Sequence, residues 1–196
     1  METSIGAIFV ESIAAKQQFL HDNAAILEHV IATIARAFRA GGKLLLFGNG
    51  GSAADAQHLA AEFVNRYVME RPPLPALALT TDTSALTAIA NDYSLAEVFA
   101  KQIQALGRRG DVALAFSTSG NSANILRALE VCREVGIYTV GLTGGSGGKM
   151  ASLVDALLCV SATSSTPRIQ ETHILIGHVI CEMVDQTLFG SESGRV

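Results

Sequence analysis

The stretch from Lys43 to Asp55 reads KLLLFGNGGSAAD, and it decides the fold class. Its first part, through Phe47, is a short apolar run of the kind found in buried parallel strands. The glycine-rich turn Gly48–Ser52 follows, and helical sequence begins directly after it at Ala53. A strand that passes through such a turn into a helix predicts an α/β fold.

The same arrangement recurs along the chain. Four further apolar segments are each followed by a polar or glycine-rich turn, with helical sequence between most of them: Leu74–Leu79, Val112–Phe116, Ile137–Leu142 and Ala156–Val160. Because strands and helices alternate, we expect a doubly wound parallel sheet with helices on both faces. We find no internal repeat, so we assign residues 41–190 to a single domain.

The two ends of the chain are predicted to be helical. Residues 5–39 contain no proline, and no glycine after Gly6, and their apolar residues recur at helical spacing. We interpret residues 1–40 as an extension of two helices that packs on the core and on partner subunits. At the other end, Thr166 is a candidate N-cap with Pro167 at the first helical position, and the periodic pattern continues to about Leu188. Residues 191–196 are expected to be a disordered tail.

Composition limits the possible partners and compartments. Hydrophobic residues make up 49% of the chain and charged residues 16%, which suggests that apolar surface is hidden in subunit contacts. The formal net charge is -4, with no basic cluster along the chain, so direct binding of nucleic acid is disfavoured. No apolar stretch is long enough to span a membrane, and the N-terminus lacks the layout of a signal peptide. Three widely spaced cysteines suit a reducing cytoplasm: Cys132, Cys159 and Cys181.

Two polar turns are candidate ligand sites, since each lies between a strand and a helix. In the glycine turn, Gly48–Ser52, backbone N–H groups can approach an anion, although ordinary α/β proteins use similar turns without a ligand. In the serine turn, Ser117–Ser122, the hydroxyls of four residues and the helix N-terminus behind them suit a phosphate monoester: Ser117, Thr118, Ser119 and Ser122. Capping and turn formation would explain one or two of these hydroxyls but do not require all four.

Two pairs of residues have the spacing of metal ligands. His58 and Glu62 are four apart on one face of the helix after the glycine turn, where a surface hydrogen bond is the simpler interpretation. Gln170 and His178 are eight apart on the last helix, about 80° around its axis, so they can face the same cleft. His173 lies about 140° away from His178, and we interpret it as a packing or solvated residue, as we do the other two histidines, His21 and His29.

These motifs together resemble the sugar isomerase (SIS) domain family and, within it, the phosphoheptose isomerases, over essentially the whole chain. The resemblance is carried, in order, by GNGGSAADAQH-x-x-x-E from residue 48, AND at 90–92, STSGNS at 117–122 and RIQE-x-H-x-x-x-x-H from residue 168. It implies a Rossmann-like five-stranded parallel sheet and a homotetramer. It also implies conversion of sedoheptulose 7-phosphate to glycero-manno-heptose 7-phosphate, the first step toward the heptose of bacterial lipopolysaccharide or capsule.

The resemblance also assigns roles to individual residues. One Zn²⁺ per subunit is expected on His58, Glu62, Gln170 and His178. Glu62 is nominated as the base that moves a proton between the neighbouring carbons through an enediol, with His178 as its acid/base partner and the metal polarising the oxygens. Substrate contacts are expected from these residues, with Glu62 and Gln170 contributing to both sets: Asn49, Gly50, Gly51, Asn91, Asp92, Ser117, Thr118, Ser119 and Ser122.

Two other functions fit the same fold. A non-catalytic relative binds a replication initiator protein, but it lacks the catalytic Glu and the final His, whereas this chain has Glu62 and His178. Sugar-phosphate-sensing regulators usually carry a DNA-binding domain as well, and these residues contain none. The sequence therefore favours the enzyme.

Overall fold

The structure is a computed structural model that describes residues 2–190. One five-stranded sheet, entirely parallel and in the order β2-β1-β3-β4-β5, forms its centre, which confirms the predicted fold class. The elements in chain order are α1 (Glu2–Arg39), β1 (Leu44–Gly48), α2 (Gly51–Val64), β2 (Ala76–Ala78), α3 (Thr83–Asp92), η1 (Leu95–Glu97), α4 (Val98–Leu106), β3 (Val112–Ser117), α5 (Ala123–Val135), β4 (Tyr138–Gly144), η2 (Gly148–Ser152), β5 (Ala156–Val160) and α6 (Thr166–Phe189).

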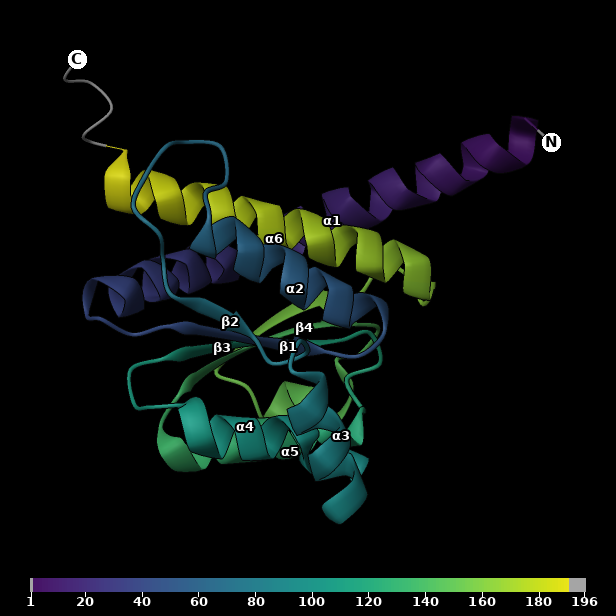
Figure 1. Cartoon of the computed structure of the whole chain (residues 1–196). Coiled ribbons are helices and arrows are strands. Elements are labelled where there is room, and N and C mark those ends of the chain that lie inside the picture. Colours follow the sequence, from purple (N-terminus) through teal and green to yellow (C-terminus); the bar gives the residue numbers. More distant parts are fainter. Residues whose placement is uncertain (1, 191–196) are drawn as a thin grey trace.

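The sheet separates two hydrophobic cores. Successive side chains of a strand point to opposite faces, so Leu44 and Leu46 of β1 join one core while Leu45 and Phe47 join the other. Helices α1, α2 and α6 cover the first face, and α3, α4 and α5 cover the second (Figure 1). This two-sided burial explains why the strands are continuous apolar runs rather than alternating ones.

The strand order places two loops side by side. The chain winds outward from β1 in both directions, to β2 on one side and to β3 on the other, so the order reverses between β1 and β3. Gly48, at the end of β1, pairs in register with Phe116, near the end of β3. Ligands of open α/β sheets bind in the crevice at such a switch point, beyond the carboxyl ends of the strands. The glycine turn and the serine turn are the two loops that leave it.

The N-terminal region is one helix, so the prediction of two helices is wrong. Helix α1 has 38 residues and is therefore about 57 Å long. From Ala15 onward its apolar side chains enter the first core, whereas its first turns project beyond the body of the molecule (Figure 1). Within residues 2–190, no helix combines the length and hydropathy needed to cross a membrane.

The last helix begins one residue earlier than expected. Ser165 occupies the N-cap position in an extended conformation, Thr166 is the first helical residue, and Pro167 still lies in the first turn, where its missing N–H leaves no bond unmade. The helix ends at Phe189, as the periodicity predicts. The expected disordered tail, residues 191–196, lies outside the described residues.

Helices α2 and α6 run side by side in the same direction (Figure 1). Their contact is close in the middle, where a Cβ added to Gly177 of α6 would lie 2.4 Å from Cδ1 of Leu59 in α2. Leu59 is itself buried, so a larger residue than glycine at position 177 would push the helices apart. These two helices carry all four residues that the sequence nominates as metal ligands.

Candidate active site

The glycine turn has a backbone that requires glycine. Gly50 has φ 56° and ψ -123°, a conformation that side chains rarely adopt. At Gly51 an added Cβ would lie 2.8 Å from Nε2 of Gln170, so the start of α2 and the amide of Gln170 are in close contact. The structure thus brings Gln170 to the glycine turn, as expected of residues that share one ligand.

A pair of amides joins the glycine turn to the serine turn. Asn49 donates from Nδ2 to Oδ1 of Asn124, and Asn124 donates back to Oδ1 of Asn49, both at 2.9 Å. Asn124 is not among the site residues predicted from the sequence. Its position in the first turn of α5, directly behind the serine turn, was the available signal. Because the pair fixes the Asn49 side chain, it also fixes the distance between the two turns.

The serine turn presents hydroxyls that do not cap the helix behind it. Ser122 occupies the N-cap position of α5, yet its side chain makes no capping bond, and its Oγ lies 3.2 Å from Oγ of Ser117. Ser119 is exposed, and its Oγ accepts a bond from the N–H of Asn121. Ordinary helix capping therefore does not account for Ser122. The hydroxyls of Ser117 and Ser122 lie together at the helix N-terminus.

Across α2 and α6, three side chains meet. The Nε2 atoms of His58 and His178 lie 2.9 Å apart, and Oε1 of Glu62 lies 3.4 Å from Nε2 of His58. The ring of Tyr67 stacks on that of His178 with centroids 5.5 Å apart. Tyr67 is not among the site residues predicted from the sequence. Burial raises the pKa of its hydroxyl, with the negative charges of nearby residues acting in the same direction.

Another unpredicted acid, Asp55, lies one turn before His58 on α2. Its Oδ2 is buried and has no hydrogen-bond partner among the described residues. Burial raises the pKa of this carboxyl, and the nearby His58 partly opposes that shift. An acidic side chain one turn from a histidine is too common in helices for the spacing alone to single it out.

Three other predicted site residues lie outside the group formed by His58, Glu62 and His178. Gln170 lies against Gly51, about 12 Å along α6 from His178, so the two must lean toward each other to share a ligand. Asn91 and Asp92 are exposed at the end of α3, and the side-chain hydrogen bond that they form joins them to each other.

His173 is a packing residue, as its helical position predicts. It is buried, and its Nε2 lies 3.1 Å from the carbonyl oxygen of Thr143 at the end of β4. Burial lowers the pKa of His173 to about 4, so the ring is neutral at pH 7. It faces the sheet rather than α2. The other two histidines, His21 and His29, are exposed.

The side chains of His58, Glu62 and His178 are of the types that bind a divalent cation. Two imidazole nitrogens and a carboxylate oxygen are the ligands that zinc prefers, and two nitrogens on one tetrahedral zinc ion lie about 3.3 Å apart. The observed separation of His58 and His178 is 2.9 Å, so a small outward shift would admit an ion. In residues 2–190, however, no three His, Cys, Asp or Glu side chains are grouped closely enough to form a ready-made metal site.

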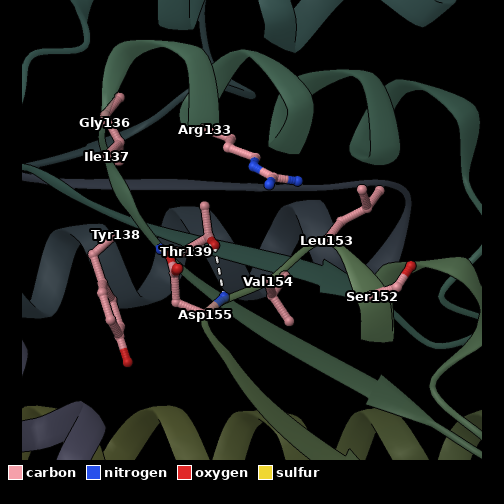
Figure 2. Close-up of a pocket in the computed structure, with 9 residues that line it drawn as sticks. All are labelled: Arg133, Gly136, Ile137, Tyr138, Thr139, Ser152, Leu153, Val154 and Asp155. Atoms are coloured by element: carbon pink, nitrogen blue, oxygen red, sulfur yellow. Dashed lines mark hydrogen bonds between the residues drawn. The ribbon is translucent and has the colours of Figure 1, made fainter.

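A cavity at the opposite end of the sheet contains a carboxylate whose role is structural. Figure 2 shows this cavity of about 450 Å³, which lies beside the first residues of β4 and the loop before β5. Its central carboxylate, Asp155, accepts bonds from the backbone N–H and the hydroxyl of Thr139, at 2.7 and 2.8 Å. These bonds join the amino ends of two strands. The cavity is therefore remote from the switch point and from the side chains that meet across α2 and α6.

Comparison with known proteins agrees with this geometry. Residues 9–144 match the family model of the SIS domain. The chain is 49% identical over 189 residues to the phosphoheptose isomerase of Thermodesulfovibrio yellowstonii, covering 96% of this chain and 94% of the relative. It is 56% identical over 174 residues to that of Desulfovibrio desulfuricans, covering 89% and 82%.

A solved structure gives the same result. The phosphoheptose isomerase of Neisseria gonorrhoeae superimposes with a TM-score of 0.88 at 46% identity, covering 94% of this chain and 98% of that one. Both the family model and these relatives extend over most of the described residues. The chain therefore belongs to the SIS domain family and, within it, to the phosphoheptose isomerases, which are enzymes.

Proposed function

We propose that this chain converts sedoheptulose 7-phosphate to D-glycero-D-manno-heptose 7-phosphate, the first step toward the heptose of bacterial lipopolysaccharide or capsule. The observation that carries the proposal is the meeting of His58, Glu62 and His178 across α2 and α6, where α2 leads directly out of the glycine turn at the switch point. Membership in an enzyme family, together with Glu62 and His178, favours catalysis over the adaptor role.

Moving a carbonyl between C1 and C2 requires a base to remove the proton beside the carbonyl and an acid to protonate the oxygen. We assign the base to the carboxylate of Glu62 and the second proton-transferring group to His178. The side chain of Glu62 is 23% exposed, which leaves it open to a substrate while α2 holds its backbone. The reaction then passes through an enediol, and the proton returns to the neighbouring carbon.

One Zn²⁺ per subunit would be held by His58, Glu62, Gln170 and His178. When bound, it would polarise the substrate oxygens and stabilise negative charge on them. A carboxylate that binds the metal tightly is less free to carry protons. We therefore assign Glu62 two alternating roles, as a loose metal ligand and as the base. The 3.4 Å separation between Glu62 and His58 is compatible with that role.

The proposed substrate is tested directly with the purified protein. Sedoheptulose 7-phosphate is supplied with and without a chelator, and formation of the aldose is followed by NMR. We expect conversion that the chelator abolishes and added Zn²⁺ restores. Absence of conversion with metal present would reject this substrate, whereas conversion unaffected by exhaustive chelation would reject the metal.

The substrate phosphate is assigned to the serine turn, because the Ser117 and Ser122 hydroxyls lie together at the N-terminus of α5. Ser119→Ala and Ser122→Ala should each raise KM about tenfold or more, since each removes a hydrogen bond to a charged group. Thr187→Val, which removes a hydroxyl that bonds to the carbonyl oxygen of Met183 near the end of α6, is the matched control. Steady-state kinetics with unchanged KM in both turn variants would place the phosphate elsewhere.

We also propose a homotetramer whose contacts include α1. Its first turns expose large apolar side chains, among them Phe9 at 66% and Val10 at 67%, which a monomer would leave in water. Phe9→Glu should therefore shift the sedimentation coefficient toward smaller species. A wild-type protein that sediments as a monomer at micromolar concentration would contradict the assembly.

We place the enzyme in the cytoplasm. Its three cysteines are free in the structure, as a reducing compartment favours: Cys132, Cys159 and Cys181.

A further inference from the structure

A buried ion pair joins the ends of the two helices that carry the proposed catalytic groups. Arg71, in the loop after α2, has a side chain that is 1% exposed, and its Nε donates to Oδ1 of Asp185 in α6 at 2.9 Å. The other end of the same guanidinium binds α2. Nη1 donates to the carbonyl oxygen of Phe63 at 2.7 Å, and Nη2 donates to that of Glu62 at 2.9 Å.

The Arg71 guanidinium thereby supplies hydrogen-bond donors and positive charge to the C-terminal end of α2. The last turn of a helix leaves carbonyl oxygens without partners and carries partial negative charge. No basic residue lies in the last turn of α2. Arg71 supplies both the donors and the charge from outside the helix. One of the carbonyls that it binds belongs to Glu62, the proposed base.

Asp185 ties the same group to α6. It lies seven residues after His178, which is nearly two full turns, so both residues are on the face of α6 that meets α2. Its side chain is 3% exposed. The guanidinium therefore contacts the backbone of Glu62 on one side and the helix of His178 on the other.

A contribution to the folding free energy does not by itself explain the buried pair of Arg71 and Asp185. Burying two charges costs desolvation free energy, and replacing a buried ion pair by apolar residues of similar size is often neutral or stabilising. An apolar pair, however, provides no directional bonds to the carbonyls of α2.

We propose that Arg71 and Asp185 are positioning residues that hold Glu62 and His58 in register with His178. This inference rests on the proposed roles of those three residues. A displacement of about 1 Å between groups that act together can lower a rate about a hundredfold. The serine turn lies on other elements, so the pair has no part in phosphate binding.

The test is a double variant, Arg71→Met with Asp185→Leu, which removes both charges together and leaves neither unpaired. We expect a folded protein whose kcat falls about a hundredfold, with KM within about threefold of the wild type. Amide hydrogen exchange in the last turn of α2 should become faster. Arg71→Lys, which keeps the charge but cannot bridge both helices, should recover only part of the rate.

A matched control separates positioning from stability. Val131→Ala creates a cavity under α5, on the opposite face of the sheet, and should lower the melting temperature without changing kcat. If the double variant fails to fold, Asp185→Asn takes its place, with a loss of kcat at unchanged KM expected.

A folded double variant, or a folded Asp185→Asn, with kcat within twofold of the wild type would overturn the proposal. Glu62→Gln is assayed beside them. If it is inactive while the Arg71 and Asp185 variants are fully active, only the positioning role fails. If Glu62→Gln is active as well, the proposed function fails.

Discussion

Glu62→Gln is expected to abolish turnover and to leave the fold intact. The substitution keeps nearly the same volume but removes the carboxylate that we assign as the base. A general base contributes about a hundredfold or more to a rate, so activity should fall below about a hundredth of the wild type. Residual activity above that level would remove Glu62 from the role.

The fold control for this variant is its melting curve. The carboxylate of Glu62 is partly exposed and pairs with His58 at 3.4 Å, so its loss should cost little stability. Glu130→Gln on α5 provides a matched comparison, since it makes the same chemical change in a half-exposed ion pair with Arg127. We expect that variant to retain full activity.

His178→Ala is expected to lose both zinc and activity. The imidazole of His178 contacts that of His58 directly, so its removal opens the proposed metal site on the α6 side. Purified protein should contain little zinc by elemental analysis. Its melting temperature should no longer rise on addition of Zn²⁺, whereas that of the wild type should rise by mass action.

His173→Ala is the comparison for that experiment. His173 faces the carbonyl of Thr143 and is fully buried, so the truncation should lower stability by about 2–4 kcal/mol through the cavity that it leaves. It should nevertheless keep its zinc. Loaded His178→Ala together with empty His173→Ala would mean that the wrong histidine has been assigned.

Patterns within one element were predicted well from the sequence. The apolar run of Leu44–Phe47 and its equivalents identified all five strands. The central strands β1, β3 and β4 are buried on both faces and therefore show no alternation of apolar and polar residues. The prediction of two N-terminal helices failed because residues 5–39 contain no breaker apart from Gly6. A periodic pattern without a cap or a break describes one long helix.

The candidate site was predictable only in part, because its support comes from residues far apart in the chain. His58 and Glu62 share a helical face, and helical spacing alone relates Gln170 to His178. The link between Arg71 and Asp185, by contrast, spans 114 positions and has no local spacing rule. The same is true of Asn124, whose partner Asn49 belongs to another turn.

The reciprocal bonds between Asn49 and Asn124 limit how this sequence can diverge. Each amide donates to and accepts from the other, so a carboxylate at either position would face a carbonyl oxygen that it cannot bind. A carboxylate at one position therefore loses the bond that the amide donated, and an apolar side chain there loses both bonds. We expect the two positions to change together or not at all among related proteins, and a lineage that loses one amide should need a compensating change at the other before the site works again.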